Sequence, residues 1–143
     1  MKNKCPRAEP FIATRNHHLS ETSEDYVEII SDLISEKGEA RICDIADQLG
    51  VSHVTVIRAT ERLKKKGYIH SGQYQPITLT AEGRRLASFC KERHKLLLEY
   101  LLALDVPESQ ASIDVEGMEH HISPITIACI KKHLHALKEL RIE

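Results

Sequence analysis

The feature that most constrains the fold is a pair of short amphipathic helices joined by a glycine. Residues 41–49 carry Ile, Ala and Leu at helical spacing, and Gly50 follows as a turn residue. Ser52 is a suitable N-cap for a second helix over residues 53–66. Two short helices around a tight glycine turn predict a helix-turn-helix.

A β-hairpin pattern follows the second helix at once. Gly67 ends the helix, and Tyr68-Ile69 and Ile77 to Leu79 then flank a segment that contains Gly72. Short apolar runs on either side of a glycine-containing turn predict paired strands. A helix-turn-helix with a hairpin directly behind it predicts a winged helix.

A further helix is expected ahead of the helix-turn-helix. Ser23 is a suitable N-cap, Gly38 is a typical stop, and the apolar residues between them recur at helical spacing: Tyr26, Val27, Ile30, Leu33 and Ile34. Residues 1–22 show neither helical nor strand periodicity. We therefore expect a flexible N-terminal extension there, with His17 and His18 as residues of a polar tail; metal binding by this histidine pair is the alternative.

The second half of the chain predicts helices alone. Thr80 caps a long helix that runs to about Leu104, where Asp105-Val106-Pro107 breaks it. Another helix is expected over residues 108–120, and Ser123-Pro124 begins the last one. An all-helical segment without a second wing suits pairing with a partner subunit.

Composition excludes several classes of protein. Lys and Arg number 20 against 21 Asp and Glu, so charge alone does not indicate a nucleic-acid binder. Trp is absent and aromatics are 4%, which argues against base stacking on single strands. No apolar run reaches membrane-spanning length and no signal peptide is evident, so we expect a cytoplasmic protein without a membrane partner. The four scattered cysteines form no C-x-x-C pair and are expected to be reduced core residues.

The second helix of the helix-turn-helix is the candidate DNA-reading element. Its residues near the N-terminus would reach base edges, and its later basic residues would contact phosphates. The residues expected to point away from Val56, Ile57 and Leu63 are Ser52, His53, Thr55, Arg58, Ala59 and Arg62, with Lys64, Lys65 and Lys66 at the helix end. Arg84 and Arg85 are candidates for further phosphate contacts. One module reads few base pairs, so a symmetric dimer on a palindromic operator is expected.

The string D-V-E-G-M-E-H-H over residues 114–121 is the candidate metal-binding element. In a helix, Glu116, Glu119 and His120 stand at i, i+3 and i+4 and share one face. Two carboxylates and an imidazole suit a divalent cation, and hard oxygen donors favour manganese or ferrous iron. The alternative is an ordinary exposed helix face. An inverted zinc-protease motif is discounted because Glu116 stands where that motif requires histidine.

Several segments together resemble the diphtheria-toxin-repressor family and, within it, the manganese transport regulators. They are residues 24–28, 46–63, 79–83, 93–94 and 114–121, of which D-x-x-E and E-G-x-E-H-H are the most specific. The resemblance extends from Ser23 to the C-terminus. It implies a site for two metal ions per subunit with Asp25, Glu28, His94, Glu116, Glu119 and His120 as ligands.

The resemblance also implies which metal is bound. The iron-responsive branch has Met and Cys at the positions of Asp25 and Glu116, so carboxylates there indicate Mn²⁺, with Fe²⁺ as the alternative. The implied architecture is mainly α: an extension (1–22), a winged-helix DNA-binding domain with a small β-hairpin wing (23–83), and a helical dimerisation and metal-binding domain (84–143).

The function implied is that of a manganese-dependent regulator, not an enzyme. As a homodimer loaded with Mn²⁺ it would bind a palindromic double-stranded operator and repress manganese-uptake genes. Three alternatives stay open. The first is a winged-helix regulator that responds to a different signal: ferrous iron, a small ligand, or thiol redox through Cys43 and Cys90. The second is a metalloenzyme. The third is a passive protein-interaction module.

Overall fold

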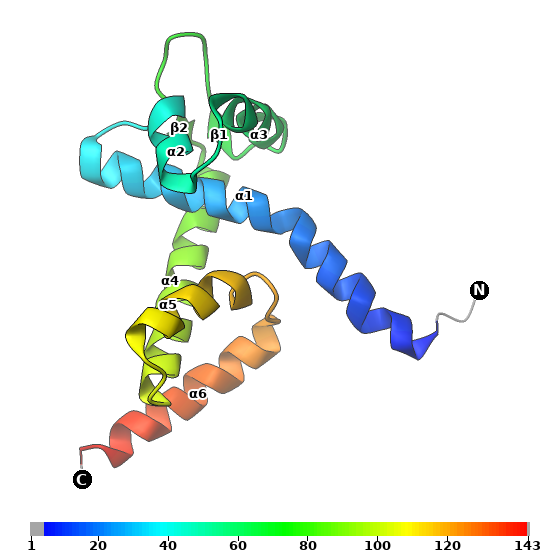
Figure 1. Cartoon of the computed structure of the whole chain (residues 1–143), viewed down its shortest axis with the longest axis vertical. Coiled ribbons are helices and arrows are strands. Elements are labelled where there is room, and N and C mark those ends of the chain that lie inside the picture. The colour runs from blue at the N-terminus through cyan, green and yellow to red at the C-terminus, as the bar shows by residue number, and fades with distance from the viewer. Residues whose placement is uncertain (1–4, 143) are drawn as a thin grey trace. The chain divides into compact units, whose positions relative to one another are not determined.

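The computed structural model describes residues 5–142 and is mainly helical, with a single small hairpin in the described part (Figure 1). The elements are the 3-10 helix η1 (Pro6–Ala8), α1 (Glu9–Lys37), α2 (Ile42–Leu49), α3 (His53–Lys65), β1 (Ile69–His70), β2 (Thr78–Leu79), α4 (Ala81–Ala103), α5 (Glu108–Met118) and α6 (Pro124–Leu140). The predicted fold class, a winged helix followed by helices, is confirmed. The first four residues of the predicted extension lie outside the described residues.

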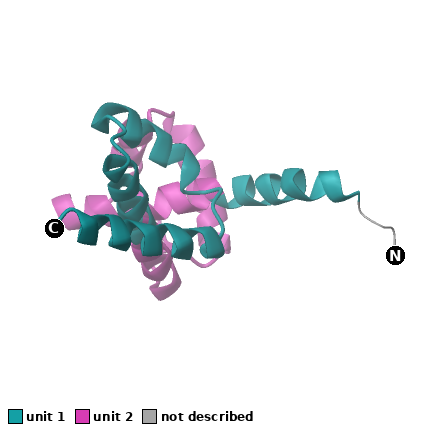
Figure 2. Ribbon diagram, turned by 90° about the horizontal axis from the view of Figure 1, so that it is seen from below, with its two compact units in different colours: residues 1–20, 91–143 teal, residues 21–90 magenta. Residues whose placement is uncertain are grey.

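The chain forms two compact units, which are described one at a time (Figure 2). Unit 2 is residues 21–90 and holds the helix-turn-helix and the hairpin. Unit 1 is residues 1–20 with 91–143 and holds α5 and α6. Helices α1 and α4 each contribute residues to both units.

The core of unit 2 joins α1, the helix-turn-helix and the hairpin. Its fully buried side chains include Val27 and Ile30 of α1, Ile45 of α2 and Val56 of α3, with Ile69 of β1 packed among them. Each helix contributes one apolar stripe, as its periodicity predicts. Burial of these stripes against one another sets the orientation of α3.

The hairpin has one more partner than the pattern predicts. Strands β1 and β2 pair antiparallel, with Ile69 opposite Leu79. Ile77 also forms an antiparallel bridge with Ala40, to whose carbonyl oxygen it donates its backbone N–H at 2.8 Å. The connection between α1 and α2 thereby fixes the base of the wing.

The predicted helix caps are confirmed at three positions. The hydroxyl oxygens of Ser52, Thr80 and Ser123 each accept a backbone N–H from the first turn of the helix that follows, at 3.2, 3.1 and 3.3 Å respectively. Gly50 ends α2 with φ of 65°, a backbone conformation that side chains other than glycine rarely adopt.

The first helix begins earlier than predicted. Helix α1 starts at Glu9, so residues 9–22 are helical and the expected start at Ser23 is wrong. Ser23 is buried and its hydroxyl accepts a hydrogen bond from Lys66 Nζ at 3.0 Å, which is a tertiary contact rather than a cap. Phe11 and Leu19 are 61% and 74% exposed, so this part of the helix carries no buried stripe that periodicity could reveal.

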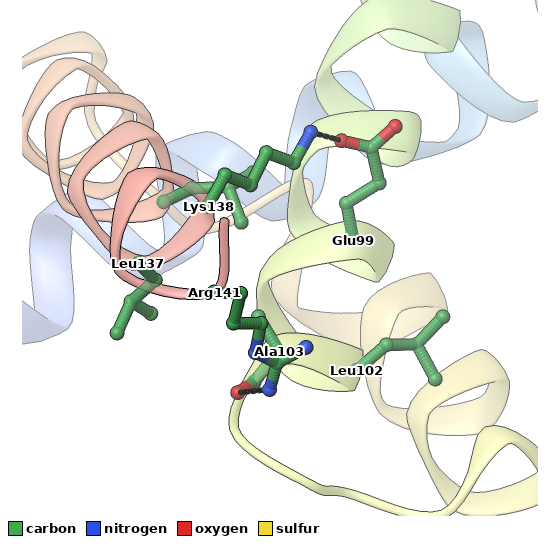
Figure 3. Close-up of a pocket in the computed structure, with 7 residues that line it drawn as sticks. Glu99, Leu102, Ala103, Leu137, Lys138 and Arg141 are labelled. Carbon is green, nitrogen blue, oxygen red and sulfur yellow. Dashed lines mark hydrogen bonds and ion pairs between the residues drawn. The ribbon is translucent and has the colours of Figure 1, made fainter. Parts of the chain in front are cut away.

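Unit 1 packs the end of α4 against α5 and α6. Leu97, Ala111, Val115 and Leu134 form its buried apolar centre. A pocket of about 210 Å³ lies between α4 and α6 (Figure 3), where Lys138 Nζ donates to Glu99 Oε2 at 2.9 Å. Its lining is largely aliphatic and offers one carboxylate beside two cationic side chains, so it is no cation site.

The cysteine prediction holds for one residue of four. Cys90 is buried, whereas Cys5, Cys43 and Cys129 are exposed. Among the described residues, no helix is both long enough and apolar enough to span a bilayer.

Candidate metal centre and DNA-reading helix

Unit 1 brings together three of the predicted metal ligands. His94 lies on α4, Glu116 lies in the last turn of α5, and Glu119 is the C-cap residue of that helix. Nδ1 of His94 donates to Oε2 of Glu119 at 2.8 Å and lies 3.8 Å from Oε1 of Glu116. One ligand atom from each residue lies within 4.8 Å of the other two.

Glu119 is the centre of this group. Its side chain is fully buried, and its second oxygen, Oε1, lies 3.4 Å from Nε2 of His120. A carboxylate removed from water loses several kcal/mol of hydration unless partners replace it. Here His94 hydrogen-bonds one oxygen, and the His120 ring lies beside the other. A buried carboxylate between imidazoles, with Glu116 at the exposed rim, is a donor set that fits a divalent cation.

The local backbone explains why Glu116 and Glu119 share a face. The predicted helix over 108–120 ends at Met118, two residues early, but Glu119 keeps helical backbone angles and donates its N–H to Val115 at 3.0 Å. The helical spacing therefore holds through Glu119, as predicted.

His120 is buried like Glu119, although it stands just after the helix. Nη2 of Arg93 donates to its Nδ1 at 3.5 Å, which turns Nε2 toward Glu119. Arg93 is itself 7% exposed. Sequence reasoning did not assign Arg93 a role, because an arginine in a helical pattern is normally a solvated surface residue.

Asp25 and Glu28, the other two predicted ligands, belong to unit 2. They stand one turn apart on α1 and are both half-buried. Burial raises the pKa of the neighbouring Tyr26 phenol, Arg62 lowers it, and Asp25 adds to the increase. The Asp25 carboxylate and the Arg62 guanidinium of α3 therefore both lie close enough to the Tyr26 phenol to act on it electrostatically.

All seven predicted DNA-contacting residues are exposed. They are Ser52, His53, Thr55, Arg58, Arg62, Lys64 and Lys65. Two neighbours were placed wrongly. Ala59 is 5% exposed and belongs to the core, whereas Ile57, expected to face inward, is 49% exposed. The buried stripe of α3 runs through Val56, Ala59, Thr60 and Leu63, the i, i+3, i+4, i+7 spacing of a helix.

Three exposed apolar side chains of this region escaped sequence reasoning. Val51, Val54 and Ile57 are 38%, 56% and 49% exposed, at or just before the first turns of α3. Apolar contact is how proteins read the thymine methyl group in the major groove. In the sequence they can be recognised as three β-branched residues that lie outside the buried stripe of α3.

A winged helix with an exposed basic helix, followed by a unit with a buried carboxylate–imidazole cluster, defines a metal-responsive DNA-binding protein. Two known domain families match this chain and agree with that class. The iron-dependent repressor N-terminal DNA-binding domain matches residues 18–77, and the iron-dependent repressor metal-binding and dimerisation domain matches residues 80–140. The chain belongs to the iron-dependent repressor family, the family named for the diphtheria-toxin repressor, and the predicted resemblance is confirmed.

Individual relatives point the same way. The transcriptional regulator MntR of Escherichia coli O157:H7 is 45% identical over 125 residues, which are 87% of this chain and 81% of that protein. The HTH-type transcriptional regulator MntR of Lysinibacillus sphaericus is 38% identical over 81% of this chain and 84% of its own length. These relatives are transcriptional regulators, which confirms that the chain is not an enzyme.

A solved structure described as a manganese-dependent transcriptional repressor in complex with manganese has the same fold. It superposes with a TM-score of 0.72 at 27% identity. The match covers 79% of this chain but 52% of the other, so this chain spans about half the length of that structure.

Proposed function

We propose that this protein is a manganese-dependent transcriptional repressor of manganese-uptake genes that binds a palindromic operator as a homodimer. The observation that carries the proposal is the buried Glu119 carboxylate between His94 and His120, in a chain that is 45% identical to an MntR regulator. A regulator that binds chromosomal DNA acts in the cytoplasm.

The proposed ligand set has six members and holds two Mn²⁺ ions per subunit. His94, Glu116, Glu119 and His120 come from unit 1, and we propose that Asp25 and Glu28 complete the set. The one-turn spacing of Asp25 and Glu28 on α1 supports this, since both carboxylates then lie on one helix face. Four carboxylates against two imidazoles favour Mn²⁺, with Fe²⁺ as the nearest alternative.

The role of this chain's own residues follows from their charges. Without metal, the four acidic side chains repel one another and disfavour the arrangement that gathers them. Bound metal supplies the positive charge that reverses this repulsion. Asp25 and Glu28 stand on the helix that also carries part of the core of the DNA-binding unit, so their engagement would restrain the position of α3. A coupling of about 1–3 kcal/mol between metal and DNA suffices for a useful switch.

The direct test is metal-dependent DNA selection by the full-length protein. A randomised duplex library is enriched with protein and Mn²⁺, and the recovered sequence is titrated with metal-free protein and with Mn²⁺, Fe²⁺ or Zn²⁺. We expect a palindromic site, with Mn²⁺ raising the affinity by about 5–150-fold.

Zinc is the critical comparison in this titration. Zn²⁺ binds most mixed N/O sites more tightly than Mn²⁺ does, so selectivity must come from coordination geometry rather than affinity. We expect saturating Zn²⁺ to activate poorly. Equal activation by Zn²⁺ would refute the geometric account, and DNA binding indifferent to every metal would refute the proposed function.

The proposed dimer surface consists of exposed apolar side chains of unit 1. Ile113 of α5 and Ile125 of α6 are 67% and 78% exposed, and Leu102, near the end of α4, is 38% exposed. Exposed aliphatic residues on a domain whose family description includes dimerisation mark the surface that a second copy would cover.

Replacing Ile125 with Lys is therefore expected to convert dimers to monomers, because the new charge would lie in an apolar interface. Light scattering coupled to size exclusion at micromolar concentration measures this. Tyr74→Lys is the matched control, since Tyr74 is 90% exposed in the wing and the same charge there should leave the dimer intact. A dimeric Ile125→Lys protein would remove α6 from the proposed surface.

A further inference from the structure

We infer a second metal site in unit 1, built from His17, His18 and His121 and suited to a nitrogen-preferring divalent cation such as Zn²⁺. It shares no residue with the six proposed manganese ligands. It also does not depend on the proposed function, because a histidine cluster binds zinc whether or not the protein regulates manganese uptake.

The three side chains converge from two segments that are far apart in sequence. The rings of His17 and His121 lie 6.1 Å apart, centroid to centroid, with their planes tilted by 50°. One ring nitrogen of His18 lies within 4.8 Å of one of His121. All three residues belong to unit 1. These contacts favour metal binding by His17 and His18, the alternative to the polar tail that the sequence predicted.

The backbone on both sides of the cluster is held in place. His121 donates its N–H to the carbonyl of Met118 at 3.0 Å and follows directly after His120, which is 4% exposed. His17 and His18 lie inside α1, eight and nine residues after its first residue, Glu9. Adjacent helical residues point about 100° apart around the helix axis, and His121 lies close to both histidine rings.

The donor atoms match the requirements of zinc rather than manganese. Zn²⁺ binds imidazole nitrogen at about 2.0–2.1 Å with tetrahedral geometry, so ligand nitrogens sit roughly 3.4 Å apart. The ligand nitrogens of His18 and His121 lie within 4.8 Å of each other, and rotation of these two exposed side chains can bring them to that spacing. Imidazole ligands favour Zn²⁺, Cu²⁺ and Ni²⁺, whereas Mn²⁺ prefers oxygen. The bound ion would tie the N-terminal turns of α1 to the turn after α5.

The test is a zinc titration of the full-length protein with the carboxylate centre disabled. In a Glu119→Gln background, we compare the chain with and without His17→Ala, His18→Ala and His121→Ala, by calorimetry and by the visible absorption of Co²⁺ as a zinc surrogate. We expect the histidine variant to bind one zinc fewer per chain and to lose the tetrahedral Co²⁺ bands. Neither readout involves DNA or manganese.

The matched control removes two other exposed histidines, His133 and His135 of α6, in the same background. Zinc stoichiometry should then be unchanged. Equal stoichiometry with and without the three cluster histidines would overturn the site, as would an equal loss in the control. Circular dichroism of each variant establishes that folding is retained; a failure of this site alone would leave the manganese response of the parent protein untouched.

Discussion

A Glu119→Gln protein should fold normally and bind its operator weakly, with no gain in affinity when Mn²⁺ is added. The parent protein is expected to gain about 5–150-fold under the same conditions, the range of a 1–3 kcal/mol coupling. Glutamine has almost the same shape as glutamate, so the buried position stays filled. What disappears is the negative charge and one of the two acceptor oxygens.

The burial of Glu119 explains why the effect should be large. Its Oε2 accepts from His94 at 2.8 Å and its Oε1 faces His120 at 3.4 Å, so one carboxylate lies between the two imidazoles of the proposed metal centre. An amide offers a donor N–H₂ on one of those sides and cannot serve a cation there. Fluorescence anisotropy of a labelled operator, at increasing Mn²⁺, measures the loss.

Two variants of the same chemistry calibrate this result. Glu116→Gln should weaken the metal response less, because Glu116 is exposed at the rim and lies 3.8 Å from His94. Glu108→Gln, in the exposed first turn of α5, should behave like the parent protein. A Glu119→Gln protein that still responds fully to Mn²⁺ would remove Glu119 from the metal centre.

Replacing Gly83 with Ala is expected to destabilise the metal-free protein by about 3 kcal/mol, toward the upper end of the usual cost of overpacking. An added Cβ at Gly83 would overlap the carbonyl oxygen of Tyr68 and would lie 3.0 Å from its carbonyl carbon. The Leu79 side chain is also close, at 3.2 Å. A backbone carbonyl cannot rotate away as a side chain can, so the helix itself must shift.

The same carbonyl already has a structural role. It accepts the backbone N–H of Thr80 at 3.0 Å, while the Thr80 hydroxyl donates to Gly67 and accepts from Gly83. The first turn of α4 is thus held against the chain segment that leads from α3 into the wing. A shift of α4 would weaken these bonds together, and we expect a cooperative loss of stability.

Gly117→Ala is the matched control for Gly83→Ala. A Cβ added there would meet no atom within 4 Å outside its own helix segment, and Gly117 lies in the last turn of α5. Alanine is favoured over glycine by roughly 0.5–1 kcal/mol in the middle of a helix and by less in a last turn, so this variant should be as stable as the parent or slightly more stable. Urea unfolding at one fixed protein concentration measures both, since dimer stability depends on concentration. Equal midpoints for the two variants would contradict the close approach of Gly83 and Tyr68.

Local patterns in the sequence were sufficient to predict the winged helix. Each of its helices buries one stripe, α3 and α4 begin with a capping side chain, and glycines stand at the turns, so short-range physics and tertiary packing agree. Ser52 and Thr80 were predicted as caps and are caps. The same holds for the shared face of Glu116 and Glu119, because helical geometry alone places residues three apart on one side.

Where a side chain is decided by a distant partner, the sequence was not sufficient. Serine is a residue type that caps helices, but Ser23 is buried and accepts a hydrogen bond from Lys66, and α1 begins at Glu9 instead. Arg93 reads as a surface arginine and is buried against His120. Gly83 reads as an ordinary helix glycine, and only the position of the Tyr68 carbonyl shows why a side chain does not fit.

The helix-turn-helix and its hairpin were therefore determined by sequence alone, since periodicity, caps and turns act over a few residues. Tertiary structure decided the rest of what matters for function. It selected which face of α3 is exposed, and it buried Glu119 between two imidazoles. It also brought His121 to the histidines of α1. Burial and convergence depend on residues far apart in the chain, and no local pattern encodes them.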